Sequence, residues 1–168
     1  MKLQDYIQNV PNFPKQGINF KDISPLLANP HAFKHVIDKM ADLASQADII
    51  VAPDARGFIF GTPVAYAINK PFVMVRKKGK LPGKTIVQNY DLEYGENAIE
   101  IQSNVLKPNL KAVIIDDVLA TGGTVDAIVK LLQSQQIETT KLIVLCELKE
   151  LNGRAKLNNL TIEALIEE

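Results

Sequence analysis

Apolar residues along the chain form two alternating patterns, short continuous runs and sets spaced three or four residues apart. Continuous runs rich in Ile and Val are typical of strands buried on both faces, and they occur at residues 49–51, 72–75, 113–115 and 142–146. The spaced sets are typical of helices with one buried face, and they occur at residues 33–44 and 125–132. The longer apolar segment at residues 58–68 predicts a buried helix. This alternation predicts an α/β fold, with a mainly parallel central sheet flanked by helices.

The remaining segments have weaker patterns. Residues 1–25 contain three prolines, which predicts a short helix followed by an irregular segment lying over the body. Asn29-Pro30 is a typical helix start, with Asn as the N-cap and Pro at the first helical position. Ile99 and Ile101 alternate with polar residues, as in a half-exposed strand, and residues 160–166 alternate weakly, as in an edge strand.

The chemically informative stretch joins the strand run at 113–115 to the helix that follows. Asp116 and Asp117 stand where the strand is expected to end, and a Gly/Thr loop, residues 121–124, precedes the helix. Glycines let backbone N–H groups turn toward a ligand, and the first helical turn adds positive dipole, so this loop is typical of an anion site. Paired carboxylates can accept hydrogen bonds from both hydroxyls of a ribose. Two solvated aspartates before a helix N-cap are the alternative, but the complete string favours a site for a phosphorylated sugar.

Bulk composition limits the possible functions. The 168 residues include 19 basic and 19 acidic side chains, for a net charge of zero, so phosphate binding has to be local and nucleic acid is not expected as a partner. The apolar runs are much shorter than the roughly 20 residues that span a membrane, and residues 1–5 lack the apolar core of a signal peptide. The single cysteine, Cys146, lies in an apolar run and is expected to be a buried thiol. These features predict a cytoplasmic protein without membrane partners.

Residues 113–124 resemble the phosphoribosyl pyrophosphate motif of the type I phosphoribosyltransferases. Four further segments are similar to those of the branch of this family that uses adenine, and they lie at residues 13–25, 55–58, 75–83 and 92–95. The resemblance implies the type I phosphoribosyltransferase fold in one domain, residues 1–168, with a small hood at residues 1–25 and a flexible lid at residues 77–97. It also implies transfer of the 5-phosphoribosyl group from phosphoribosyl pyrophosphate to adenine, giving AMP and pyrophosphate in purine salvage.

The same resemblance implies roles for individual residues. Asp116 and Asp117 would hold the ribose hydroxyls as catalytic carboxylates. Phe20, Lys21 and Val118 would bind adenine, with the backbone of Lys21 offering one donor and one acceptor to the base edge. The 5′-phosphate would be bound by Ala120, Thr121, Gly122, Gly123 and Thr124.

A second set of residues is implied to hold pyrophosphate and to close the site. The pyrophosphate group comprises Asp54, Ala55, Arg56, Arg76, Lys77 and Lys80. An unusual cis peptide is implied near Asp54-Ala55. Glu93 would be the acid–base group at the purine imidazole nitrogen, and Tyr90 and Tyr94 would be lid residues. Magnesium would be bound through the substrate and water, with no direct protein ligand, and a homodimer is implied.

Two other functions remain open from the sequence. Hypoxanthine or guanine could be the base, but these purines present a carbonyl where adenine has its amine, and so need the opposite donor arrangement. Purine-responsive transcription regulators share this fold, but they need a nucleic-acid surface, and this chain has no net positive charge. A P-loop site is not supported, because no Gly-Lys-Ser/Thr is present.

Overall fold

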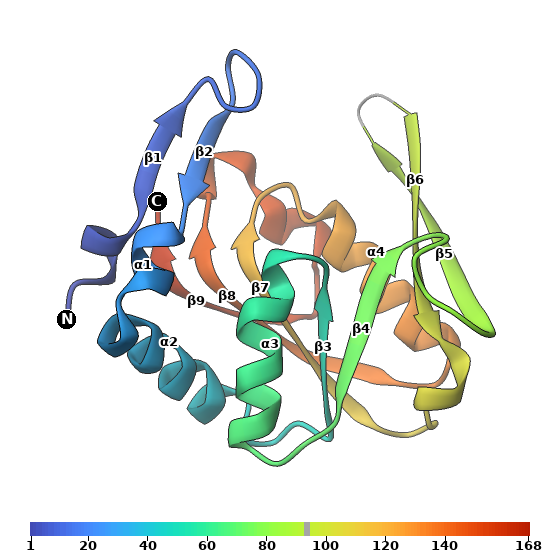
Figure 1. Ribbon diagram of the computed structural model, residues 1–168. Helices are drawn as coiled ribbons and strands as arrows, with labels where there is room; N and C mark the ends of the chain where they lie inside the picture. Colours follow the sequence, from blue (N-terminus) through green and yellow to red (C-terminus); the bar gives the residue numbers. More distant parts are fainter. Residues whose placement is uncertain (93–94) are drawn as a thin grey trace.

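A computed structural model describes residues 1–92 and 95–168. The described residues form a seven-stranded sheet and a separate two-stranded sheet, with helices packed on the larger one (Figure 1). The α/β fold with a mainly parallel sheet is therefore confirmed. Among these residues, no helix is long and apolar enough to cross a membrane.

The larger sheet has the strand order β5-β6-β4-β3-β7-β8-β9. Neighbouring strands from β4 to β9 along this order are parallel, whereas β6 pairs antiparallel with both β4 and β5. The parallel strands are β3 (Ile49–Pro53), β4 (Phe72–Lys77), β7 (Lys111–Leu119), β8 (Glu138–Glu147) and β9 (Thr161–Glu167). Their carboxyl ends therefore meet at one edge of the sheet.

The helices begin and end at residues that suit those positions. The four α-helices are α1 (Ser24–Ala28), α2 (Pro30–Leu43), α3 (Arg56–Ala67) and α4 (Gly123–Ser134). The predicted N-cap of α2 is confirmed, because the Asn29 side chain accepts hydrogen bonds from the backbone N–H groups of His31 and Ala32, at 3.1 and 3.0 Å. The short helix α1 was not predicted from the sequence, because its single turn is too short to show a period.

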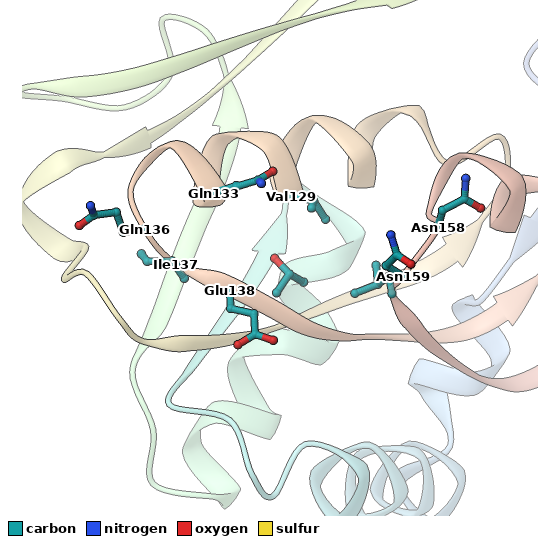
Figure 2. A pocket seen from close by; sticks show the side chains of 9 residues that line it. Val129, Gln133, Gln136, Ile137, Glu138, Asn158 and Asn159 are labelled. Atoms are coloured by element: carbon teal, nitrogen blue, oxygen red, sulfur yellow. The ribbon is translucent and has the colours of Figure 1, made fainter.

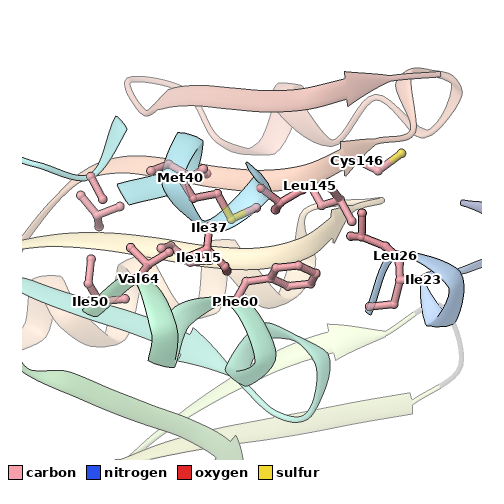
Figure 3. Close-up of a cluster of buried hydrophobic side chains, with 14 of the residues drawn as sticks. Ile23, Leu26, Ile37, Met40, Ile50, Phe60, Val64, Ile115, Leu145 and Cys146 are labelled. Carbon is pink, nitrogen blue, oxygen red and sulfur yellow. The ribbon is translucent and has the colours of Figure 1, made fainter. Parts of the chain in front are cut away.

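Apolar side chains pack on both faces of the parallel strands, as the continuous runs predicted. On one face Ile50 and Ile115 pack with Met40 of α2 and Phe60 of α3 (Figure 3). On the other face the buried residues of α4 pack over Ile114 and its neighbours. Cys146 is buried, as expected, and burial first, then the nearby Glu168 carboxylate, raise the pKa of its thiol to about 11.

Two antiparallel hairpins lie in segments for which the sequence predicted no strand pairing. The N-terminal segment contains β1 (Gln8–Pro11) and β2 (Asn19–Asp22), paired antiparallel as a hairpin. The expectation of an irregular segment was wrong because four-residue strands between prolines show too few alternations to be recognised. The second hairpin pairs β5 (Thr85–Leu92) with β6 (Gly95–Gln102). The strand expected around Ile99 and Ile101 is the second strand of this hairpin.

Candidate active site

The predicted site residues lie at the carboxyl ends of neighbouring parallel strands. Asp116 and Asp117 lie near the end of β7, Asp54 directly follows β3, and Arg76 lies near the end of β4. Because β3 is hydrogen-bonded to β4 on one side and to β7 on the other, the three groups share one edge of the sheet. Ligands of open parallel sheets bind outside this edge.

The two aspartates of β7 occupy different environments. Asp117 is buried, with an exposed fraction of 6%, and it forms an ion pair with Arg56. Asp116 is half-buried, and its Oδ1 accepts a 2.8 Å hydrogen bond from the backbone N–H of Asp117. Burial, followed by the adjacent Asp117 carboxylate, raises the pKa of Asp116 well above its usual 3.8. The pair is therefore an electrostatically costly feature, and such features gather at functional sites.

Helix α3 approaches the acid pair closely at Gly57. A Cβ at this position would lie 3.0 Å from Asp116 Oδ1 and 3.3 Å from the backbone oxygen of Ile115. A glycine lets the first turn of α3 lie directly against the end of β7. The peptide bond between Asp54 and Ala55, just before this turn, is cis, which confirms the expectation from the resemblance.

The loop between β7 and α4, called here the phosphate loop (residues 120–124), is shaped by close backbone packing. Gly122 is the N-cap of α4 and has a φ of +84°, a conformation that favours glycine. A Cβ on Gly122 would lie 2.8 Å from the backbone oxygen of Gly153, and a Cβ on Gly153 would lie 2.4 Å from the backbone oxygen of Ala120. The loop and the turn at Gly153 thus fit together only without side chains at these two positions.

The phosphate loop encloses a small pocket next to the acid pair. The pocket has a volume of about 100 Å³ and is lined by Asp116 and residues 118–125. Backbone N–H groups at the start of α4 are free of intrahelical partners, so an anion here meets hydrogen-bond donors and the positive end of the helix dipole. Val118, expected to contact the base, lines the same pocket.

Strand β5 brings one predicted lid residue against the phosphate loop. The Tyr90 hydroxyl lies 3.4 Å from Thr124 Oγ1 and accepts a 3.2 Å hydrogen bond from Asn97 Nδ2 on β6. Tyr90 thus connects the hairpin to the start of α4. The other two residues assigned to this region, Glu93 and Tyr94, lie outside the described residues.

Arg56 lies with the hood residues and not with the other cations of its predicted group. Its guanidinium carbon is 4.7 Å from the centre of the Phe20 ring, and its Nη1 donates a 2.9 Å hydrogen bond to the backbone oxygen of Lys21. With the ion pair to Asp117, these contacts tie the hood to the acid pair. The bond also shows that the Lys21 carbonyl faces the site.

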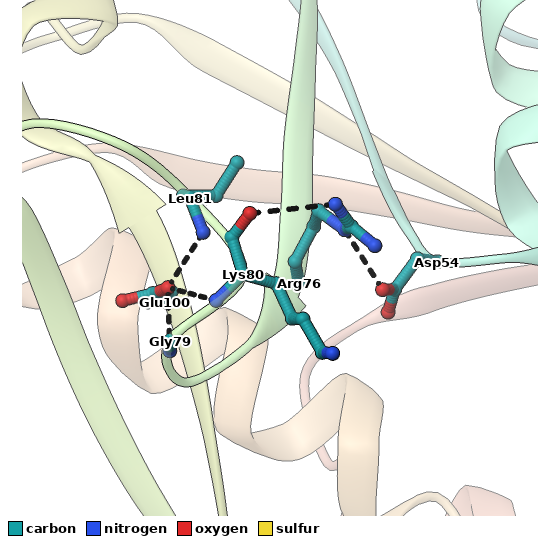
Figure 4. Close-up of polar contacts among 6 residues, drawn as sticks. All are labelled: Asp54, Arg76, Gly79, Lys80, Leu81 and Glu100. Carbon is teal, nitrogen blue, oxygen red and sulfur yellow. Dashed lines mark hydrogen bonds and ion pairs between the residues drawn. The ribbon is translucent and has the colours of Figure 1, made fainter.

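The cations after β4 form a separate group, the basic loop (residues 77–84). Arg76, directly before this loop, pairs with Asp54 through Nε at 3.0 Å, and its Nη1 lies 3.4 Å from the backbone oxygen of Lys80 (Figure 4). Lys77 and Lys80 are exposed, and with Lys78 they line a pocket of about 430 Å³ that reaches the β5–β6 hairpin. The structure therefore brings Asp54, Arg76 and Lys80 together.

One buried carboxylate, which the sequence did not single out, organises the basic loop. Glu100 Oε1 accepts hydrogen bonds from the backbone N–H groups of Gly79, Lys80 and Leu81, at 2.9, 3.0 and 3.0 Å (Figure 4). Burial alone would raise the pKa of Glu100, but the bonds from Leu81, the Thr85 side chain, Gly79 and Lys80 outweigh burial and lower it below the usual 4.5. The half-exposed strand predicted around Ile99 and Ile101 would place Glu100 on its exposed face, and this was wrong, since the exposed fraction of Glu100 is 3%. The basic loop covers the Glu100 side chain, and the alternation of residues in a strand does not show that another segment will cover it.

A second unpredicted ion pair supports the turn at Gly153. Arg154 donates from Nε and Nη2 to the two carboxylate oxygens of Glu147, both at 2.7 Å. Glu147 ends β8 and is 3% exposed. The pair fixes the residue next to Gly153 to the sheet, and so holds Gly153 against the phosphate loop.

A larger pocket lies away from this edge. Its volume is about 490 Å³, and it lies where α4 ends and β8 begins, near Asn158 and Asn159 (Figure 2). None of the predicted site residues lines it. The carboxyl edge, and not this pocket, is therefore the candidate active site.

Comparison with known proteins agrees with this geometry. The model of the phosphoribosyl transferase domain matches residues 22–160. The adenine phosphoribosyltransferase of Mycoplasmopsis pulmonis (strain UAB CTIP) is 61% identical over 166 residues, which are 99% of this chain and 98% of the relative. The adenine phosphoribosyltransferase of Butyrivibrio fibrisolvens is 48% identical over 158 residues, covering 93% of this chain and 88% of the relative.

Solved structures are also similar over nearly the whole chain. The adenine phosphoribosyltransferase of Thermoanaerobacter pseudethanolicus has a TM-score of 0.95 and 43% identity, with 99% of this chain and 98% of that chain covered. The enzyme of Saccharomyces cerevisiae, in complex with D-2,5-dideoxy-2,5-imino-altritol 1,6-bisphosphate and adenine, has a TM-score of 0.93 and 36% identity, with 98% and 96% covered. By its matched domain, its close relatives and its fold, the chain belongs to the phosphoribosyltransferase family.

Proposed function

We propose that this enzyme transfers the 5-phosphoribosyl group of phosphoribosyl pyrophosphate to adenine and releases AMP and pyrophosphate. The observation that carries the proposal is the acid pair, Asp116 and Asp117, of which Asp116 lines the pocket formed by the phosphate loop. The names of the relatives, adenine phosphoribosyltransferase, support the choice of base.

The phosphate loop and the acid pair would bind the phosphorylated sugar. Backbone N–H groups of residues 120–124, with the Thr121 and Thr124 hydroxyls, would hold the 5′-phosphate at the start of α4. The carboxylates of Asp116 and Asp117 would accept hydrogen bonds from the ribose hydroxyls. Their negative charge also favours the cationic, oxocarbenium-like sugar that forms when pyrophosphate departs.

The hood would select the base. The Lys21 carbonyl faces the site, and an exocyclic amine can donate to it once Arg56 has moved to the pyrophosphate. A purine with a carbonyl at that position would place two acceptors against each other. Phe20 offers a ring face for stacking, which the Arg56 guanidinium occupies here. Val118 would contact the other side of the base.

The cationic residues would neutralise the departing pyrophosphate. Arg76 is already oriented by Asp54, and Lys77 and Lys80 stand exposed beside it. Arg56, next to the cis peptide at Asp54-Ala55, would complete the group. Cations fixed in position before the reaction stabilise charge that develops in the transition state.

Magnesium fits this arrangement as a substrate-bound ion. Hard carboxylate oxygens suit Mg²⁺, which usually keeps several waters, and the half-buried Asp116 carboxylate borders the phosphate-loop pocket. Asp116 and Asp117 would contact the hydrated ion, which, when bound, supplies positive charge to the phosphate oxygens. In the described part of the chain, no three His, Cys, Asp or Glu side chains converge on a metal position.

We further propose that Glu93 exchanges the proton at the purine imidazole nitrogen and that Tyr90 and Tyr94 close over the reacting groups, within a lid at residues 77–97. A cytoplasmic homodimer with one domain per chain, residues 1–168, remains part of the proposal. Size-exclusion chromatography with light scattering tests the dimer.

The function is tested by measuring phosphoribosyl transfer with adenine, hypoxanthine and guanine in parallel, with Mg²⁺ and phosphoribosyl pyrophosphate. We expect turnover of adenine and little of the other two. The Asp117→Asn variant, which should fold but bind the sugar poorly, is the control for background activity. Turnover of hypoxanthine without adenine would overturn the choice of base, and no turnover of any purine would overturn the transferase function.

A further inference from the structure

The carbonyl and the side chain of Lys21 make separate contacts, and base binding does not explain the contacts of the side chain. While its carbonyl accepts from Arg56, its ammonium donates to Asn9 Oδ1 at 2.6 Å and forms an ion pair with Glu168. The exposed fraction of Lys21 is 6%. A buried ammonium is costly unless it is paired and hydrogen-bonded, so these partners decide where the residue can lie.

Glu168, the residue directly after β9, is fixed to the central sheet. Its backbone N–H donates to the oxygen of Glu147 at 2.9 Å, and its backbone oxygen accepts from the N–H of Lys149 at 2.7 Å. These bonds place residue 168 beside the carboxyl end of β8, the strand that neighbours β7. In Figure 1 the C-terminus lies next to the β1–β2 hairpin.

The hairpin depends on this connection for its position. It forms a sheet of its own and shares no strand pairing with the seven-stranded sheet in the described parts of the chain. Among the eight residues of β1 and β2, all of which the structure describes, Lys21 is the one that is buried. The hairpin is therefore anchored through Lys21 more than through any other position in its strands.

We propose that Glu168 is a positioning residue for base recognition, acting through Lys21. The ion pair, with the hydrogen bond to Asn9, clamps β2 against the end of the sheet and so sets the distance between the Lys21 carbonyl and the acid pair. The proposal rests on the proposed function, since it assigns the Lys21 carbonyl to the base. None of the three clamp residues lines the phosphate-loop pocket, so the clamp acts on the base and not on the sugar phosphate.

The test is steady-state kinetics of the Glu168→Gln variant, with each substrate varied in turn. We expect the KM for adenine to rise about tenfold, with kcat and the KM for phosphoribosyl pyrophosphate changing less than about twofold. The matched control is Glu167→Gln, because the neighbouring Glu167 pairs with Lys149 on the surface, where both side chains are about half exposed. This control should behave as the unmodified enzyme does.

A charge exchange separates positioning from general stability. Lys21→Glu alone should raise the KM for adenine, and Lys21→Glu combined with Glu168→Lys should restore it to within about threefold of the unmodified value. An unchanged KM for adenine in Glu168→Gln, or an equal rise for both substrates, would overturn the proposal, as would failure of the double variant to recover. If Glu168→Gln does not fold, the KM for adenine of the charge-exchange variant and of Glu168→Asp tests the proposal in its place.

If the unmodified enzyme uses another purine, the proposed function is wrong, and the same variants are then measured with that purine as the varied substrate.

Discussion

The phosphate loop takes its shape from backbone packed against a second turn, whereas the basic loop takes its shape from one carboxylate. Gly122 and Gly153 leave no room for a Cβ between them, so the phosphate loop is packed tightly against the turn at Gly153. A Cβ on either glycine of the basic loop, Gly79 or Gly83, would meet nothing within 4 Å, and three N–H groups on Glu100 hold that loop together. A dense loop suits a phosphate that stays bound through the reaction, and a loosely packed one suits a pyrophosphate that leaves.

The largest expected effect comes from filling the contact in the phosphate loop. Gly122→Ala combines a positive φ with a Cβ 2.8 Å from the Gly153 oxygen, so we expect the free energy of unfolding to fall by about 3 kcal/mol. AMP affinity should fall about 100-fold, since the N–H groups lose their common direction. Chemical denaturation and calorimetric titration with AMP measure the two effects.

Gly83→Ala is the matched control in the basic loop. Its φ of +76° is similar, but a Cβ there would meet nothing, so stability should fall by only about 1 kcal/mol and AMP affinity should not change. Equal losses of AMP affinity in the two variants would mean that the contact with Gly153 does not shape the phosphate loop.

The second-largest expected effect comes from removing the Glu100 carboxylate, and it should be confined to the basic loop. Glu100→Ala leaves the N–H groups of residues 79–81 without their acceptor, so we expect affinity for pyrophosphate to fall about tenfold and stability to fall by about 2 kcal/mol. AMP, which does not use this loop, should bind within about twofold of its usual affinity. The control is Glu138→Ala, which removes an exposed carboxylate from the start of β8, away from the site. A comparable loss of AMP affinity would show that the two loops are not independent.

A fall in pH should change the stabilities contributed by Glu100, which holds the basic loop, and by Asp116 of the acid pair in opposite directions. The lowered pKa of Glu100 means that its stabilisation is complete above pH 4.5 and is lost as the pH falls through the folded-state value. The raised pKa of Asp116 means that the fold favours the protonated carboxyl, so stability falls as the pH rises above 3.8 toward the folded-state value.

Denaturation of two isosteric variants between pH 3 and pH 7 measures this difference. At pH 7 Asp116→Asn should be more stable than the unmodified protein by about 1 kcal/mol, and the gain should vanish as the pH falls toward 3.8. Glu100→Gln should be less stable at pH 7, and its deficit should shrink as the pH falls below 4.5 and through the folded-state pKa of Glu100. Deficits of the same sign in both variants would contradict the pKa directions.

The smallest effect concerns the contact between the hairpin and the phosphate loop. The Tyr90 hydroxyl lies at 3.4 Å from Thr124 Oγ1, a long distance for a hydrogen bond between hydroxyls. Tyr90→Phe should therefore reduce stability by about 0.5 kcal/mol and AMP affinity by about twofold. A loss above tenfold in an AMP titration would make Tyr90 a principal ligand-binding residue.

The sequence predicted the phosphate loop well because its signals are local. The strand run, Asp116, Asp117, both glycines and the helix spacing lie close together in the chain, and the structure has the expected order of strand, loop and helix. The expected end of the strand at the aspartates was wrong, because β7 continues to Leu119. The residues that brace the site could not be found in this way. Glu100 is 21 positions from Gly79, and Glu168 is 147 positions from Lys21. Their partners are set by strand pairing, which a hydrophobic pattern does not specify.

Arg56 was predicted as a site residue, but its partners in the structure could not be predicted from the sequence. Its position after β3 was predicted, and so was the cis peptide beside it. Its partners were not, because Phe20 and the Lys21 carbonyl reach it only once the hood has folded over the sheet. A long, flexible side chain at a sheet edge can reach several groups, and sequence does not choose among them.

The contact between Gly122 and Gly153 joins the middle of the chain to a turn that the ribosome adds only after β8. A nascent chain that ends at Glu147 already carries the acid pair and every residue of the phosphate loop, but nothing presses on Gly122 from the opposite side. We expect the chain to gain the ability to bind AMP only after the turn at Gly153 has been synthesised. Fragments released early from the ribosome would then carry the sugar-binding carboxylates and still be inert toward AMP.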